Sequence, residues 1–138
     1  ANAGRRRDTR RMPSIVAISG TSRPNNYTSR ALGVVVDELR TQGADVTVLD
    51  ARELTLNFPG HPLTEDAKRL AETVRSAHGV VLATPEYHGT FAAMTKLILE
   101  NMGFPSALKD KPTALLGIAQ GRIGAIKSLV EVKMGESS

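Results

Sequence analysis

Hydrophobic residues along the chain follow two alternating patterns. Short continuous apolar runs predict buried strands, and the stretches between them place apolar residues at helical spacing. The predicted strands cover residues 14–18, 45–49, 79–84 and 113–119. The predicted helices cover residues 28–42, 65–74 and 91–102, and a fourth begins within 125–132. Because strand–helix–strand units join parallel strands through right-handed crossovers, the alternation predicts an α/β fold with a parallel sheet.

Residues at the ends of these elements support the assignment. Gly43 follows the first helix and is typical of a C-terminal stop. Thr64 is placed to cap the second helix, and Glu65 and Asp66 in its first turn match the helix dipole. The strand at 79–84 is apolar on both faces, which predicts a central position in the sheet.

The segment after the first strand is the most informative in the chain. Gly20 permits a sharp change of backbone direction, and the next residues supply hydroxyls, amides and one positive charge. These residues are Thr21, Ser22, Arg23, Asn25, Asn26, Tyr27 and Thr28. The following helix would point its unpaired N–H groups and positive dipole end into the turn, which is a natural place for a phosphate. The alternative is an ordinary connection whose Asn and Thr residues only cap the helix.

Two further polar turns follow strands. Residues 85–90 come directly after the third strand, and residues 120–124 come directly after the fourth. In an open parallel sheet, ligands bind beyond the carboxyl ends of the strands, and all three turns lie at that edge. Three polar, glycine-bearing turns at one edge therefore predict a ligand site there.

Asp50 ends the second strand, where a Rossmann dinucleotide-binding unit carries an acidic residue. The first turn of this chain, however, does not have the G-x-G-x-x-G pattern of such a unit. We therefore interpret Asp50 as a loop or capping residue.

Composition narrows the possible functions of this chain of 138 residues. The absence of Cys excludes disulfides, thiolate metal sites and a Cys nucleophile, and it suits a cytoplasmic protein. His61, His78 and His88 have no metal-ligand spacing, so we predict no metal site. No apolar run approaches the roughly 20 residues of a membrane span, so we predict no membrane partner.

The net charge of +4 belongs to residues 1–12, which hold five Arg and one Asp, so the remaining residues are neutral in sum. Such a tail could bind nucleic acid or a membrane surface, but we favour a disordered extension. The domain itself, residues 13–138, lacks the aromatic and basic strand pattern that stacks RNA bases. We therefore predict no nucleic-acid partner.

The three turns resemble those of the NAD(P)H-dependent FMN reductase family, flavodoxin-like proteins that include quinone and azo-dye reductases. The family's first turn, G-S-x-R-x-x-S-x-T, here reads G-T-S-R-P-N-N-Y-T, with Thr21 and Asn26 in place of the two Ser. The second turn, P-E-Y-N-G, here reads P-E-Y-H-G, with His88 in place of Asn. The third turn keeps both glycines of S-x-G-x-x-G and loses the Ser. The resemblance covers roughly residues 14–130.

The resemblance implies a set of contacts to FMN. The residues expected around the phosphate are Thr21, Arg23, Asn26, Tyr27 and Thr28. Those expected along the ribityl chain and the flavin ring are Pro85, Glu86, Tyr87, His88 and Gly89. Those expected at the other edge of the ring are Gln120, Gly121, Arg122 and Gly124. Tyr87 could instead serve packing, His88 could be a solvated loop residue, and Glu86 could pair across an interface or cap a helix.

The implied function is that of an oxidoreductase in which NADPH or NADH passes hydride to FMN. Reduced FMN would then pass electrons to a small-molecule acceptor: a quinone, free flavin, azo compound or metal oxyanion. Because the cofactor carries this chemistry, we assign no catalytic side chain, and Arg122 is a candidate contact for the NADPH phosphates. The alternatives are a flavodoxin-like electron carrier without NAD(P)H oxidation of its own and a domain that binds no flavin. The near-neutral charge of the domain argues against the carrier, since such carriers are usually acidic.

A flavodoxin-like sheet has five strands in the order 2-1-3-4-5, and this sequence supplies four. We therefore expect a three-layer sandwich that lacks the fifth strand and the last helix, so that the domain is incomplete at its C-terminus. A partner subunit could cover the exposed edge of the fourth strand. The resemblance implies a homodimer or homotetramer with flavin sites near the interface.

Overall fold

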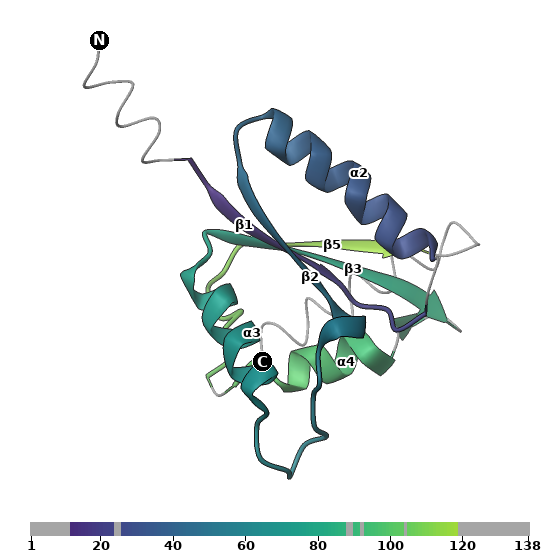
Figure 1. Ribbon diagram of the computed structural model, residues 1–138, viewed down its shortest axis with the longest axis vertical. Helices are drawn as coiled ribbons and strands as arrows, with labels where there is room; N and C mark the ends of the chain where they lie inside the picture. The colour runs from purple at the N-terminus through teal and green to yellow at the C-terminus, as the bar shows by residue number, and fades with distance from the viewer. Residues whose placement is uncertain (1–11, 24–25, 88–89, 92, 104, 119–138) are drawn as a thin grey trace.

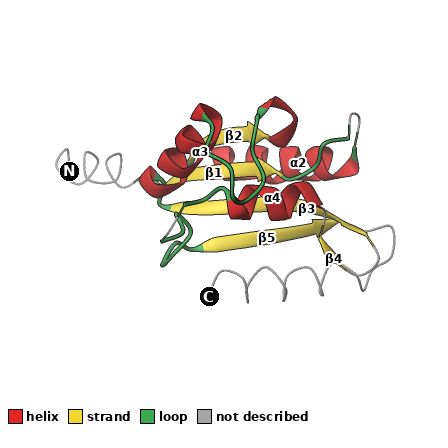
Figure 2. Cartoon of the chain, turned by 90° about the horizontal axis from the view of Figure 1, so that it is seen from below, coloured by secondary structure: helices red, strands yellow, loops and turns green. Residues whose placement is uncertain are grey.

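The four predicted strands form one parallel sheet. The computed structural model describes residues 12–23, 26–87, 90–91, 93–103 and 105–118. Its parallel strands are β1 (Ser14–Ser19), β2 (Asp45–Asp50), β3 (Gly79–Tyr87) and β5 (Thr113–Ile118). They lie in the order β2-β1-β3-β5 (Figures 1 and 2), the order of the first four strands in a flavodoxin-like sheet. The predicted fold class and the central position of the third strand are therefore confirmed.

Helices cover both faces of this sheet (Figure 1). α2 (Tyr27–Thr41) lies on one face, and α3 (Glu65–Ser76) and α4 (Ala93–Glu100) lie on the other. Side chains of β1 alternate between the two layers, because Ala17 packs with Leu32 and Val36 of α2, whereas Val16 and Ile18 pack with α3 and α4. None of the described helices is long and apolar enough to cross a bilayer.

A row of four aliphatic side chains crosses the sheet on the α3–α4 face. Leu49, Ile18, Leu82 and Leu115 are register partners on β2, β1, β3 and β5. Ile18 and Leu82 in the middle are 0% and 1% exposed, while the two outer residues are partly buried. Complete burial of such a side chain stabilises a fold by about 1.5–3 kcal/mol, so the middle of the row contributes most.

The predicted helix signals are present in the structure. Gly43 follows α2 with a φ of 97°, the left-handed conformation of a C-terminal stop. Thr64 caps α3, and its Oγ1 accepts a hydrogen bond from Ala67 N at 3.0 Å. The predicted apolar stripe of α3 is buried throughout; it consists of Ala67, Leu70, Ala71 and Val74.

The prediction was wrong at the junction between the third strand and the third helix. The third strand does not end at Thr84 but continues through Pro85 to Tyr87. The chain then returns as the short strand β4 (Thr90–Phe91), which pairs antiparallel with the end of β3. Phe91 is therefore a strand residue, and α4 begins only at Ala93. What had the composition of a turn is in large part a continued strand.

β3 tolerates Pro85 because of where β1 stops. Val80 N donates to Pro112 O on the β5 side, and Ala83 O accepts from Gly20 N on the β1 side. Since backbone groups alternate between the two sides of a strand, residue 85 faces the β1 side. β1 has already ended at Ser19, the register partner of Ala83. The missing N–H of proline therefore costs no hydrogen bond of the β1–β3 ladder.

The loop between η1 (Ala51–Glu53) and α3 is fastened to the first turn of the helix. Thr55 N donates to Asp66 Oδ2 at 2.8 Å, and Thr64 Oγ1 donates to Thr55 O at 2.5 Å. Arg69 forms an ion pair with the same carboxylate. The Thr55 N–H, and after it the Arg69 guanidinium, holds the pKa of Asp66 below its ordinary value.

We expect the substitution Asp66→Asn to reduce the loss of stability in acid. A carboxylate whose pKa is lower in the folded state stabilises the fold above its unfolded pKa, about 3.9, and that stabilisation disappears as the pH falls through the folded pKa. Urea unfolding at a series of pH values from neutral to about pH 2 would measure the effect. Glu65→Gln is the control, since Glu65 forms only an exposed pair with Lys68. Identical acid dependence in Asp66→Asn and wild type would contradict the prediction.

Candidate functional site

The carboxyl ends of β1, β3 and β5 lie at one edge of the sheet (Figure 2). Ser19 is in register with Ala83, and Ile118, the last residue of β5, is in register with Pro85. The turn after β1 and the far end of β3 are therefore neighbours, as the prediction of a shared edge requires. The third predicted turn, residues 120–124, follows β5 in the sequence. Its proposed ligand residues Gln120, Gly121, Arg122 and Gly124 lie outside the described residues.

Gly20 is needed for a different reason from the one that its sequence context suggests. Its φ is not positive, so the turn does not use the conformational freedom of glycine. Instead, a Cβ at this position would lie 2.4 Å from Thr95 Oγ1 and 2.9 Å from Ala83 O. The Gly20 N–H donates to that same carbonyl at 2.7 Å. Close approach of β3 and α4 leaves no space for a side chain here.

Asn26 caps α2 and shapes the turn that leads into it. Its Oδ1 accepts from Ser29 N at 2.6 Å, and its Nδ2 donates to Arg23 O at 2.5 Å. The N–H groups of Tyr27 and Thr28 precede Ser29 in the helix, so they have no acceptor within it. These two N–H groups and the positive end of the helix dipole are directed toward the turn.

Hydroxyl groups surround the start of α2. Thr21 and Thr28 are each 2% exposed, and Thr21 Oγ1 accepts from Arg23 N at 3.2 Å. Ser19 Oγ and Ser29 Oγ lie 2.8 Å apart and join the end of β1 to the first turn of the helix. Hydroxyls at this position can donate to an anion without introducing a competing negative charge.

Two larger side chains lie at the exposed rim of this turn. Arg23 is exposed, and Tyr27 is 68% exposed with the Arg30 guanidinium carbon 4.9 Å from its ring centroid. Residues 19–30 include no acidic side chain. The helix N–H groups, the hydroxyls and the guanidinium together form a donor set suited to a phosphate.

The second predicted segment contributes an extended backbone to the site. Pro85 is buried at the end of β3, and Glu86 and Tyr87 continue the strand and pair with β4. His88 and Gly89 lie outside the described residues. The structure thus brings Pro85, Glu86 and Tyr87 to the same edge as Thr21 and the start of α2.

Sequence reasoning missed four hydroxyl residues at this edge: Ser19, Ser29, Thr84 and Thr95. Thr84 and Thr95 are both 0% exposed, and their Oγ1 atoms lie 2.8 Å apart. Thr95 occupies a core position of α4, three residues before the buried Ile98. A hydroxyl residue at a core position of an apolar helix was the signal that could have identified it.

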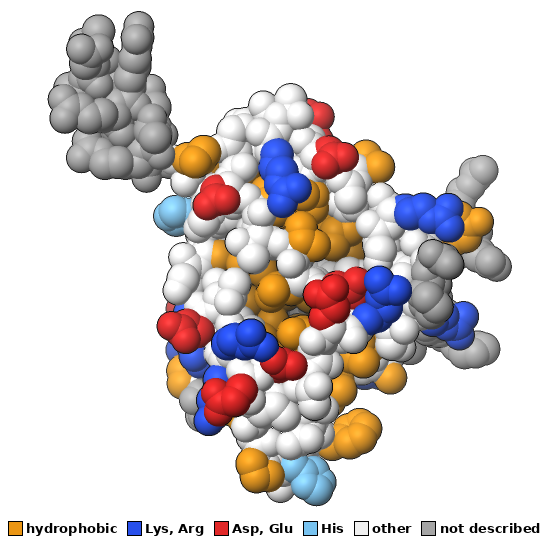
Figure 3. All heavy atoms as spheres, viewed as in Figure 1, with side chains coloured by type: hydrophobic (Ala, Val, Ile, Leu, Met, Phe, Trp, Pro, Cys, Tyr) orange, Lys and Arg blue, Asp and Glu red, His pale blue; other side chains and the backbone are white. Residues whose placement is uncertain are grey.

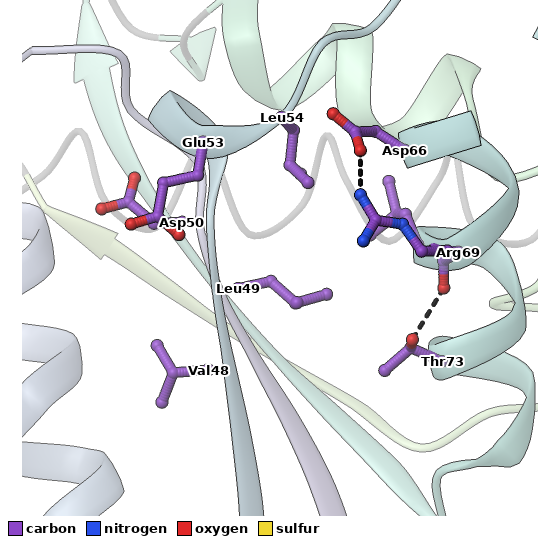
Figure 4. A pocket seen from close by; sticks show the side chains of 9 residues that line it. Val48, Leu49, Asp50, Glu53, Leu54, Asp66, Arg69 and Thr73 are labelled. Carbon is purple, nitrogen blue, oxygen red and sulfur yellow. Dashed lines mark hydrogen bonds and ion pairs between the residues drawn. The ribbon is translucent and has the colours of Figure 1, made fainter. Parts of the chain in front are cut away.

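A hollow of about 350 Å³ lies between β2 and α3, away from the turn after β1 (Figure 4). In the face drawn in Figure 3, apolar side chains lie at its floor and charged ones at its rim. Its charged groups are largely paired, because Asp66 binds Arg69 and Asp50 binds Arg52. Asp50 also accepts from Arg52 N at 2.9 Å at the start of η1, so its interpretation as a capping residue is confirmed.

Sequence comparison connects the chain to flavin-dependent reductases. Residues 13–133 match the family model described as NADPH-dependent FMN reductase. An NADPH azoreductase of Bacillus sp. (strain OY1-2) is 33% identical over 118 residues, and an NAD(P)H-dependent FMN reductase of Pseudomonas aeruginosa is 30% identical over 123. Each alignment covers 83% of this chain, and the chain spans 64% of the length of each of these relatives.

Solved structures share the fold. FerB, a flavoenzyme NAD(P)H:(acceptor) oxidoreductase from Paracoccus denitrificans, superimposes with a TM-score of 0.76 at 20% identity, over 91% of this chain and 71% of FerB. An NADH:FMN oxidoreductase (EMOB) in its apo form gives a TM-score of 0.75 at 20% identity, over 90% of this chain and 67% of its own. The family match extends over every described strand of the sheet and over the phosphate-suited turn after β1. The chain therefore belongs to the NADPH-dependent FMN reductase family.

Proposed function

We propose that this chain binds FMN at the carboxyl edge of β1, β3 and β5, in a protein that oxidises NADPH or NADH. The electrons would pass to a small-molecule acceptor, for which a quinone, free flavin, azo compound and metal oxyanion are the candidate classes. The observation that carries the proposal is the turn after β1. Its N–H groups and hydroxyls lie at the N-terminus of α2, Arg23 belongs to the same turn, and Gly20 at its start is hydrogen-bonded to Ala83 of β3.

The residues of the turn would hold the flavin phosphate. Thr21 and Thr28 offer hydroxyls, Tyr27 and Thr28 offer backbone N–H groups, and Arg23 offers a charged donor. Hydrogen bonds to charged groups contribute about 1.5–3 kcal/mol each, more than neutral ones. Asn26 would act mainly by holding the turn, because both ends of its amide are already bonded within it.

The residues at the end of β3 would hold the flavin ring. The extended backbone of Pro85, Glu86 and Tyr87 continues from Ala83, whose carbonyl accepts from Gly20 N of the phosphate turn, and His88 and Gly89 follow it in the chain. On the far side of the ring we place Gln120, Gly121, Arg122 and Gly124, which follow β5 in the chain. When bound, FMN supplies the chemistry of hydride acceptance and electron transfer, while the protein binds and orients the reactants.

Flavin uptake together with turnover tests this proposal. Purified protein is titrated with FMN and with riboflavin, and NADPH and NADH oxidation is then followed with a quinone and with an azo dye as acceptors. We expect FMN to bind more tightly than riboflavin, which lacks the phosphate, and the FMN-loaded protein to oxidise NAD(P)H. Flavin binding without NAD(P)H oxidation would favour an electron carrier. A protein that takes up no FMN would contradict the proposed site.

The substitution Arg23→Ala is expected to weaken FMN binding by roughly tenfold to a hundredfold, since it removes a charged donor to the phosphate. Riboflavin affinity should change little. Quenching of flavin fluorescence during titration measures both constants. Arg52→Ala is the matched control, because Arg52 is also an exposed arginine and pairs with Asp50 after β2. Equal FMN affinity in Arg23→Ala and Arg52→Ala would remove Arg23 from the phosphate site.

A further inference from the structure

Two threonine hydroxyls form a buried link beneath the phosphate turn. Thr95 Oγ1 on α4 donates to Gly20 O at 2.9 Å and lies 2.8 Å from Thr84 Oγ1 on β3. Both side chains are 0% exposed. The link joins residues 75 positions apart in the sequence, and it lies where the first turn of the site meets the end of β3.

Thr95 is the hydrogen-bond donor of this link. Gly20 O is a carbonyl and can only accept, and Thr95 Oγ1 donates to it. Thr84 Oγ1 is a second acceptor for the Thr95 hydroxyl, and it donates in turn to Pro85 O at 3.0 Å. Valine has no hydroxyl and cannot take the place of Thr95 in this link, despite its similar shape.

The link holds the first residue of the turn from two directions. Gly20 N donates to Ala83 O of β3, and Gly20 O accepts from Thr95 of α4. The missing side chain of Gly20 is what allows Thr95 to come this close, because a Cβ would lie 2.4 Å from its hydroxyl oxygen. Thr21, the first residue with a side chain in the turn, follows immediately.

We propose that Thr95, supported by Thr84, is a positioning residue that sets the place of the phosphate turn relative to the end of β3. The inference rests on the proposed function, since the turn is taken to hold the phosphate and the end of β3 to hold the ring. A phosphate and a ring in one molecule lie at a set distance. A turn that moves relative to β3 would therefore contact one part of FMN at the expense of the other.

Selective loss of phosphate recognition distinguishes this role from general support of the fold. Thr95→Val is expected to weaken FMN binding by about tenfold, the size of one lost hydrogen bond, and to leave riboflavin affinity unchanged. Thr95→Ser keeps the hydroxyl and should bind FMN nearly as wild type does. Thr73→Val is the matched control, because Thr73 is also a helical threonine whose hydroxyl donates to a backbone carbonyl, Arg69 O at 2.7 Å.

Hydrogen exchange in the flavin-free protein provides a second readout. Thr95→Val should speed the exchange of amides at residues 20–23, and Thr95→Ser should not. FMN binding in Thr95→Val at the wild-type level, or an equal loss of FMN and riboflavin binding, would overturn the positioning role. If wild type binds neither flavin, the proposed function fails, and the exchange data alone test whether Thr95 positions the turn. In that case, equal exchange at residues 20–23 in Thr95→Val and Thr95→Ser would refute the positioning role.

Discussion

Replacing Gly20 by alanine is expected to lower the free energy of unfolding by about 3 kcal/mol and to weaken FMN binding at least about tenfold. The new Cβ would meet Thr95 Oγ1 at 2.4 Å and Ala83 O at 2.9 Å. Thr95 is 0% exposed and hydrogen-bonded on both sides, so it has no empty space to move into. The turn, β3 or α4 must therefore shift, and the hydrogen bond from Thr95 to Gly20 O is strained or lost.

Gly33→Ala is the control for this substitution. Gly33 lies within α2, and a Cβ built there meets nothing within 4 Å apart from the local backbone of its own helix. Because alanine is favoured over glycine inside a helix by about 0.5–1 kcal/mol, this variant should be slightly more stable than wild type. Urea unfolding and FMN titration of both variants measure the difference. A Gly20→Ala protein as stable as Gly33→Ala would show that the turn tolerates a side chain.

Replacing Leu82 by alanine is expected to cost about 2–5 kcal/mol, the range for a fully buried leucine. Leu82 is 1% exposed on the central strand, between its register partners Ile18 and Leu115. Strands on both sides and helices above it hold the surrounding atoms in place, so the cavity would collapse only in part. Much of a domain's net stability of about 5–15 kcal/mol could be lost through this one position.

Leu115→Ala is the matched comparison, since it removes the same atoms from the same row one strand away. Leu115 is only partly buried, and its truncation leaves a smaller cavity and loses less transfer free energy. Chemical unfolding of both variants gives the two losses of unfolding free energy, provided that the slope of free energy against denaturant concentration is the same in both. Equal costs for Leu82→Ala and Leu115→Ala would mean that β5 is as deeply covered in solution as β3.

Most of the fold could be read from local patterns. The apolar run at β3, the stripe of α3 and the capping by Thr64 are each set by residues within about a dozen positions of one another, so the sequence predicts them directly. The end of β3 was harder to predict. A proline commonly ends a strand. Pro85 is accommodated because β1 ends at Ser19, opposite Ala83, so no residue of β1 pairs with residue 85 and its missing N–H costs no ladder hydrogen bond.

The candidate site divides in the same way. The chain by itself indicates a helix start rich in donors after β1, because Asn26, Thr28 and Arg23 are neighbours in sequence and their chemistry is local. The sequence cannot indicate why residue 20 must be glycine or why residue 95 is threonine. Those requirements arise where β1, β3 and α4 meet, from a contact between residues 75 positions apart. Close packing of distant segments is a property of the folded molecule, and only the tertiary structure decides which side chains it brings within hydrogen-bonding distance.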